Sequence, residues 1–184
     1  HDGGGMFSNL NYVIHHISIA LEIGCEPIID MENYPTRYNE KNKIQKISNS
    51  WEYYFEPINN YKLKDVYKSK FVIIVDGKTR KKIEFDDFQK KHYVILKKYI
   101  RVKKEILDEV KKFLKKNFRN KRVLGVHFRG TDMKTQERHP YPATLEQITS
   151  FIDHEIKKNN YKKIFLVTEE FEYMKKLKLR YGDT

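Results

Sequence analysis

The sequence predicts an α/β fold built on a doubly wound parallel β-sheet. In the second half of the chain, helical apolar periods alternate with short apolar runs, in the order helix, strand, helix, strand, helix. The apolar runs are continuous, which is typical of parallel strands that helices cover on both faces. The 184 residues are 39% hydrophobic and 14% aromatic, which is enough apolar material for a core. We therefore expect a globular chain.

The first predicted element is a helix that follows the glycine-rich turn "HDGGGMFSN". Ser8 or Asn9 is the expected cap, and the helix continues to about Ile23, with Gly24 as its stop. The apolar positions of one face follow helical spacing: Leu10, Val13, Ile14, Ile17 and Leu21. This is the strongest helical pattern of the first half.

Two strands are predicted in the rest of the first half. They are "EPIIDM" at 26–31 and "KFVIIVDGK" at 70–78, and the polar stretch 33–50 between them is a loop or lid candidate. In "SWEYYFEPIN", the helical spacing of Trp51, Tyr54 and Phe55 before Pro57 favours a place in the core over a binding surface. The lysine-rich residues after the second strand are interpreted as a linker.

The second half contains the clearest pattern. A helix is expected from about Val102, with Ile106, Val110, Phe113 and Leu114 on its apolar face. The later elements are a strand at 121–128, a helix at 145–156, a strand at 162–168 and a helix at 170–179.

Composition limits the partners and the compartment. The 37 Lys and Arg against 25 Asp and Glu give a net charge of +12, which suits an anionic partner such as nucleic acid, phosphate or a membrane surface. Lysines occur along the whole chain, so a general compositional bias is the favoured explanation of the charge. Cys25 is the single cysteine, which excludes an internal disulfide and favours a reducing compartment. No apolar run is long enough for a transmembrane segment.

Polar groups gather where the predicted strand 121–128 ends. His127 and Arg129 alternate with Phe128, so their side chains project to one side while Phe128 points into the packing. Gly130 permits a sharp turn or a close approach to a ligand. An arginine at the carboxyl end of a parallel strand suits a bidentate grip on phosphate oxygens. The alternative is a surface ion pair between Arg129 and Asp132.

Four segments, in order, resemble the α-1,6-fucosyltransferases and their relatives, which include the nodulation fucosyltransferases and the protein O-fucosyltransferases. "GVHFRGTDMKTQERHP" resembles a family stretch of His, any residue, Arg, Arg or Gly, Thr, Asp and Lys. "FLVTEEFEYMKKLKLRYGD" is similar to a strand that ends in Ala-Thr-Asp-Asp. "GGGMFSNLNYVIHH" and "SNSWEYYFEPIN" resemble the glycine-rich turn with its helix and a Gly-Trp-Glu-x-x-Phe-x-Pro segment.

The resemblance implies a GT-B-like glycosyltransferase of two Rossmann-like lobes with parallel sheets. Residues 1–100 would form the N-terminal, acceptor-side lobe, and residues 101–184 the start of the nucleotide-sugar-binding lobe, which would be incomplete in this chain. The reaction would transfer fucose from GDP-fucose to a glycan hydroxyl with inversion, without a cofactor or a metal. We expect a piece of a longer, bacterial, cytoplasmic protein, with membrane association left open. This piece would be inactive alone if later strands supply part of the guanine site.

Residue roles follow from the same resemblance. Arg129 would neutralise the diphosphate of the leaving GDP, Glu137 would be the base that takes the acceptor proton, and Asp132 would be its substitute. The remaining substrate-binding residues would be His127, Gly130, Thr131, Lys134, His139, Thr168, Glu169, Glu170, Gly4, Gly5 and Asn9.

Departures from the family and simpler explanations leave alternatives open. The family often has arginine where this chain has Gly130 and lysine where it has Met133, and Lys134 or Arg138 would have to supply the missing charge. Glu137 is also explained as a solvated loop charge, and Glu169 and Glu170 as carboxylates that favour a helix N-terminus. Other possible functions are transfer from another nucleotide sugar, a catalytically inactive homologue that acts as a partner subunit, and nucleic-acid binding. No known nucleic-acid-binding motif is visible, so no nucleic-acid partner is expected.

Overall fold

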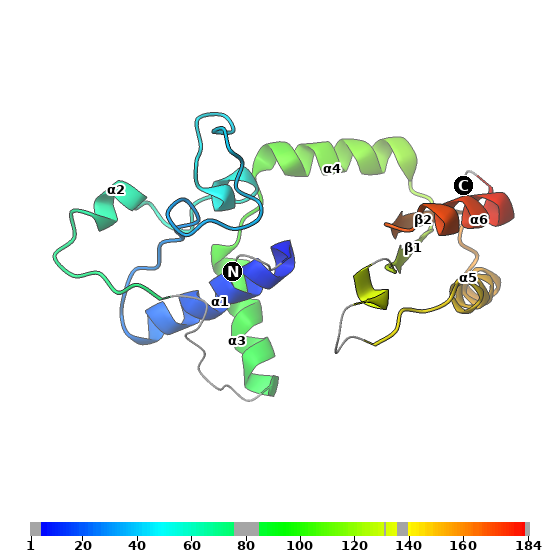
Figure 1. Cartoon of the computed structure of the whole chain (residues 1–184), viewed down its shortest axis with the longest axis horizontal. Helices are drawn as coiled ribbons and strands as arrows, with labels where there is room; N and C mark the ends of the chain where they lie inside the picture. The colour runs from blue at the N-terminus through cyan, green and yellow to red at the C-terminus, as the bar shows by residue number, and fades with distance from the viewer. Residues whose placement is uncertain (1–4, 76–84, 131, 136–139, 183–184) are drawn as a thin grey trace. The chain divides into compact units, whose positions relative to one another are not determined.

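The computed structural model describes residues 5–75, 85–130, 132–135 and 140–182, of which 85–89 and Asp132 are described by their backbone alone (Figure 1). Its described part is a mixed α/β chain with a two-stranded parallel sheet. The chain divides into two compact units, residues 1–108 and 109–184. The division lies inside a helix, whereas the sequence places it between residues 100 and 101.

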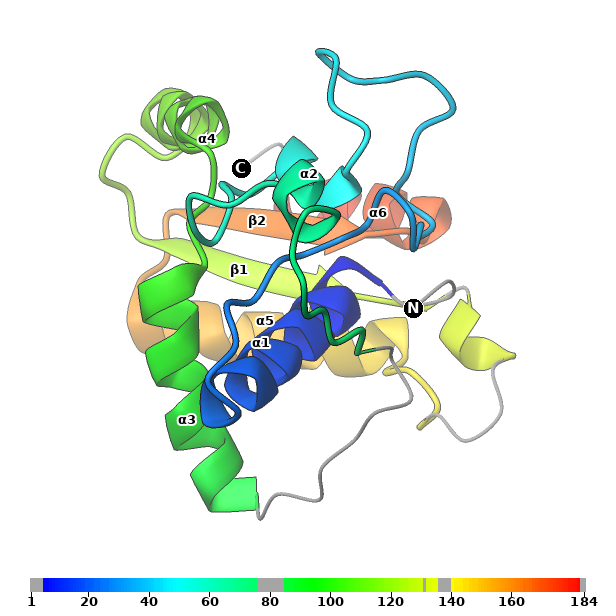
Figure 2. The ribbon, with the colours of Figure 1, turned by 90° about the vertical axis from the view of Figure 1, so that its left-hand side faces the viewer.

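The sheet belongs to the second unit. Strand β1 (Val123–Phe128) pairs in parallel with β2 (Lys163–Thr168) (Figure 2). The register sets Val123 opposite Lys163 and Phe128 opposite Thr168. Helix α5 (Leu145–Asn159) connects the strands, and α6 (Phe171–Tyr181) follows β2. All four elements lie within two residues of the predicted bounds, except for the end of α5, which extends three residues beyond Ile156.

Local chemistry defines the ends of α5. The hydroxyl of Thr144 accepts the N–H of Gln147, and the Gln147 side chain accepts the N–H of Thr144, which forms a capping box. At the other end, Asn160 adopts the left-handed conformation with φ 45° and terminates the helix.

Helices α5 and α6 cover the same face of the sheet. Phe128, Ile152 and Leu177 are the buried centre of this core, against which the alternate strand residues Leu124, Val126, Ile164 and Leu166 pack. On the opposite face, Phe165 and Val167 remain 40% and 49% exposed. On this face Phe113 and Phe118 contact Phe165 edge-on, so the described residues show close helix packing on one face of the sheet, and the helical coverage of its second face stays a prediction.

Helix α4 (Lys104–Asn117) confirms the amphipathic pattern predicted from about Val102. Its apolar side chains are nevertheless not buried: Leu107, Val110, Phe113 and Leu114 are 42–47% exposed. The helices that the structure describes are all too short or too polar to cross a lipid bilayer.

The core of the first unit lies between α1 (Met6–Glu22) and α3 (Phe85–Tyr99), with the 3₁₀ turn η1 (Ser50–Tyr53) beside them and α2 (Leu63–Val66) in a later loop. The buried members of this core are Val13, Ile14, Ile17, Trp51, Phe55, Ile58 and Ile95. Trp51 stacks on Phe55 as a core pair, which confirms the sequence interpretation for both, whereas Tyr54 is 38% exposed. The interpretation of α3 as a linker is wrong.

Helix α1 begins earlier than predicted. Gly5, not Ser8 or Asn9, is its N-cap, and the N–H of Met6 donates to the hydroxyl of Tyr38 at 2.8 Å. A side chain 32 residues away therefore satisfies one of the free N–H groups of the first turn. At the other end, Gly24 has φ 72°, which confirms the predicted stop.

Neither strand predicted in the first unit forms among the described residues, which include 70–75 but not 76–78 of the second one. Asn49 accepts the N–H of Met31 at 3.1 Å and donates to the carbonyl of Ile29 at 2.8 Å, and Asn59 donates to the carbonyl of Pro27 at 2.7 Å. Alternate residues of an extended chain direct their backbone groups to the same edge, so two asparagine side chains occupy the edge where a strand would pair. The described residues also provide no strand partner for 71–75.

Candidate functional site

The candidate site is at the carboxyl ends of β1 and β2. Because Phe128 pairs with Thr168, the residues that follow each strand, Arg129 with Gly130 and Glu169 with Glu170, meet at one edge of the sheet. Phe128 is 2% exposed, while His127 and Arg129 are exposed, so the side chains alternate as the sequence predicts. The ring of Phe128 stacks on Tyr173 of α6 with 4.9 Å between centroids, which fixes the end of β1 against that helix.

Two donors of β1's end converge on one oxygen. The backbone N–H of Gly130 donates to Oε1 of Glu169 at 3.3 Å, and Nε of Arg129 lies 3.8 Å from the same oxygen. The side chains of Arg129 and Glu169 are 49% and 43% exposed, so this contact is open to solvent. A guanidinium and a backbone N–H directed at one anionic oxygen form a suitable arrangement for binding a phosphate or carboxylate.

The second carboxylate has a different environment. Oε1 of Glu170 lies 2.6 Å from Nζ of Lys134, and the Glu170 side chain is only 17% exposed. The hydrogen bond to Glu170 raises the pKa of Lys134 above its ordinary value. The same ammonium lies 5.1 Å from the centre of the Tyr173 ring, a cation–π distance. Lys134 is therefore already paired with Glu170. It could bind a donor phosphate, as the sequence predicts, only after this ion pair opens.

Gly130 allows this arrangement because it lacks a side chain. A Cβ at that position would lie 2.4 Å from Oε1 and 2.8 Å from Cγ of Glu170, closer than real contacts. The hydroxyl of Thr168 accepts the N–H of Glu170 at 3.1 Å, which orients the start of α6. The absence of a side chain at Gly130 thus provides the space in which Glu170 fits.

The other predicted residues are only partly located. Asp132 lies in the 3₁₀ turn η2 (Asp132–Lys134), whose backbone alone is described at this residue, so its ion pair with Arg129 stays a prediction. Four predicted site residues lie outside the described residues: Gly4, Thr131, Glu137 and His139. Arg138, the second replacement cation, also lies outside them.

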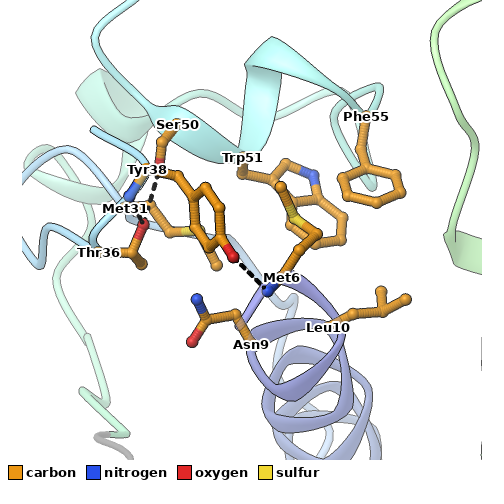
Figure 3. Close-up of a pocket in the computed structure, with 9 residues that line it drawn as sticks. All are labelled: Met6, Asn9, Leu10, Met31, Thr36, Tyr38, Ser50, Trp51 and Phe55. Carbon is orange, nitrogen blue, oxygen red and sulfur yellow. Dashed lines mark hydrogen bonds between the residues drawn. The ribbon is translucent and has the colours of Figure 1, made fainter. Parts of the chain in front are cut away.

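Gly5 and Asn9 belong to the first unit. Asn9 is 4% exposed and lines a small pocket with Met6, Thr36, Tyr38 and Ser50 (Figure 3). The pocket encloses about 10 Å³, roughly the room that one water molecule needs. A ligand would reach Asn9 through the neighbouring groove, which this residue also lines.

That groove is an open depression of about 1870 Å³ beside α1, lined by this helix and by loop residues between 23 and 75. Four tyrosines line it: Tyr12, Tyr34, Tyr61 and Tyr67. Sequence reasoning missed them, because 13 tyrosines are spread along the chain and no spacing separates these four from the rest. Tyrosine offers an apolar ring face with a polar hydroxyl, a combination that suits sugar rings.

Three histidines gather where α1 meets α3. The ring of His15 lies 5.9 Å from that of His16 and 6.2 Å from that of His92, between centroids. Burial, with a smaller contribution from the charge of His15, lowers the pKa of His92. In the part of the chain that the structure describes, no group of His, Cys, Asp and Glu side chains has the arrangement of a metal site.

Comparisons of the chain with protein-family models, with curated proteins and with solved structures found no match.

Proposed function

We propose that this chain is part of an inverting glycosyltransferase that transfers fucose from GDP-fucose to a glycan hydroxyl. The proposal includes a GT-B-like architecture of two Rossmann-like lobes, in which the second unit binds the donor. The observation that carries it is the convergence of the Arg129 guanidinium and the Gly130 N–H on one anionic oxygen, at the carboxyl end of a parallel strand. The ordered resemblance to the α-1,6-fucosyltransferases supplies the donor and the reaction.

The proposed chemistry is a single displacement at the anomeric carbon. The acceptor oxygen forms a bond to that carbon while the bond to the β-phosphate of GDP breaks, and negative charge develops on the phosphate oxygens. Arg129 would stabilise this charge, since a fixed guanidinium is most effective where charge appears in the transition state. Glu137, by its resemblance, would accept the proton of the acceptor hydroxyl, with Asp132 as the alternative base.

The acceptor glycan is proposed to bind the first unit. The tyrosine-lined groove beside α1 supports this assignment, because it combines aromatic faces with polar partners such as Asn33, which donates to the hydroxyl of Tyr67 at 2.7 Å. This surface supports a chain of sugars as the class of acceptor, without identifying the individual sugars.

Calorimetric titration of GDP-fucose into the full chain tests the proposal. We expect binding that Arg129→Ala weakens about tenfold or more, since hydrogen bonds to a charged group contribute about 1.5–3 kcal/mol. Arg122→Ala is the matched control, because it removes the same charge at the other end of the strand. Arg122 lies just before β1, and its guanidinium stacks over the ring of Tyr161. The control should retain binding.

The other outcomes separate the alternatives. Binding of UDP-glucose in place of GDP-fucose would indicate transfer from another nucleotide sugar. Because the donor lobe is expected to be incomplete in this chain, turnover is measured on a chain extended beyond Thr184, and donor binding without turnover by that longer chain would indicate an inactive homologue. DNA or RNA affinity that falls steeply with salt and survives Arg129→Ala would favour a nucleic-acid-binding protein. If neither donor binds this chain, the titration is repeated with a chain extended beyond Thr184, and no binding by the longer chain would contradict the proposal.

A further inference from the structure

The two adjacent glutamates at the end of β2 have separate roles. Glu170 is directed inward, is 17% exposed and is held by Lys134 at 2.6 Å beneath the Gly130 turn. Glu169 is 43% exposed and faces Arg129 and the Gly130 N–H across longer distances of 3.8 and 3.3 Å. The Glu170 carboxylate is thus part of the folded turn, while the Glu169 carboxylate can leave its partners with little disturbance to the core.

We propose that the carboxylate of Glu169 is an internal substitute for an anionic ligand. Its Oε1 occupies the position where a phosphate oxygen would receive the Gly130 N–H and the Arg129 guanidinium, and ligand binding displaces it. This inference rests on the proposed function for the complete ligand, which would be a nucleoside diphosphate sugar. The displacement itself concerns only the oxyanion position and is tested with a simpler probe.

Charge explains why displacement favours a phosphate. In the observed state the Glu169 carboxylate lies beside Arg129, so an incoming anion must compete with it. A phosphate group presents several oxygens and more charge than a carboxylate, and a planar guanidinium binds two of those oxygens at once. Glu169 therefore sets the threshold above which an anion occupies the site, and weakly charged anions remain outside.

The probe is inorganic pyrophosphate, titrated into the full chain in the presence of EDTA. Glu169→Ala should bind it more tightly than the natural chain by up to about fivefold, the factor that corresponds to an exposed ion pair. Glu169→Gln, which keeps the size of the side chain, should also bind more tightly. Arg129→Ala should weaken binding both alone and combined with Glu169→Ala.

Glu172→Ala is the matched control. Glu172 is an exposed glutamate of the first turn of α6 that pairs with Lys175 at 3.2 Å, so its loss changes the net charge equally without touching Arg129. Its affinity for pyrophosphate should stay within about twofold of the natural chain, because an exposed charge outside the contact acts only through screened, longer-range forces.

Three results would overturn the inference. They are equal affinities of the Glu169→Ala and Glu172→Ala variants, a gain in Glu169→Ala that persists without Arg129, and no pyrophosphate binding by any variant. Failure of the proposed function gives a different result. In that case Glu169→Ala would still bind pyrophosphate more tightly, while GDP-fucose would not bind to any variant.

Discussion

Glu170 occupies the space that a side chain at position 130 would need, with its Oε1 2.4 Å from the place of a Cβ on Gly130. We therefore expect Gly130→Ala to destabilise the second unit by about 1–3 kcal/mol, the usual cost of overpacking. Thermal unfolding of the full chain, followed by circular dichroism, measures this change. In a Glu170→Ala background the same substitution should cost much less, and equal costs in both backgrounds would contradict the steric explanation.

Asn49 is expected to be essential to the fold of the first unit. Asn49 is 4% exposed, and its side chain bonds the backbone of Met31, Ile29 and Trp51. Asn49→Ala therefore leaves one buried and two partly buried backbone groups without this partner and should cost about 1–3 kcal/mol. Trp51, the single tryptophan, lies in η1, and its fluorescence during urea unfolding reports this unit. Asn59→Ala, which removes the bond to Pro27, should have a smaller effect.

Acidification should loosen the packing of α1 on α3. The folded pKa of His92 lies below 6.5, so the unfolded chain binds this proton more readily and the stability contributed by neutral His92 is lost as pH falls below 6.5. The other titratable or charged groups near His92 lie on the same two helices. They are His15 and His16 of α1 and the ion pair between Lys91 of α3 and Glu22 of α1, with 3.7 Å between Nζ and Oε1.

The measurement is the urea midpoint of Trp51 fluorescence at pH 7.5 and 5.5. His92→Gln should reduce the difference between the two midpoints. His154→Gln changes an exposed histidine of the second unit and should leave that difference unchanged. A His92→Gln chain with the full pH dependence would exclude His92 as the titrating group.

Asp153 should stabilise α5 against α6 only above the acid range. The hydrogen bond from Arg180 at 2.6 Å, with a second from the hydroxyl of Tyr181 at 2.8 Å, lowers the pKa of Asp153 below its ordinary 3.8. The stability is present above the unfolded pKa and lost as pH falls through the folded pKa.

Because both charged side chains are at least one-third exposed, Asp153→Asn should cost at most about 1 kcal/mol at pH 7. Thermal unfolding at pH 7 and near pH 2 tests this expectation, since the variant and the natural chain should converge at the lower pH. Combination with Arg180→Gln at pH 7 should show the coupling, and additive effects would exclude a direct interaction.

The sequence predicts well those elements that local chemistry determines. The helix α5 has its apolar period, its capping box at Thr144 and its left-handed end at Asn160 within one continuous stretch. The meeting of Arg129 with Glu169 also follows from sequence, because parallel strands that precede both residues bring their carboxyl ends together.

Long-range partners explain the failures. The apolar run 71–75 has strand composition, but a strand exists only when a neighbour pairs with it, and nothing within the run identifies a neighbour. Likewise, Tyr38 completes the start of α1 and Lys134 binds Glu170 across 32 and 36 residues, with no period that links either pair. Helix α3 could have been predicted from the sequence, since Phe88, His92, Ile95 and Tyr99 follow helical spacing. The many lysines in this region favoured its interpretation as a linker.

The unpaired run in the first unit also affects how the protein behaves at high concentration. Phe71, Val72, Ile73 and Ile74 are 46–73% exposed, and a short, exposed, β-prone run is a site for pairing between chains and aggregation. Lys68 and Lys70 precede this run, and we expect their positive charges to oppose the association of two chains, because the charges of approaching copies repel one another. Salt screens that repulsion, so this chain should stay dispersed in dilute buffer and precipitate as ionic strength rises.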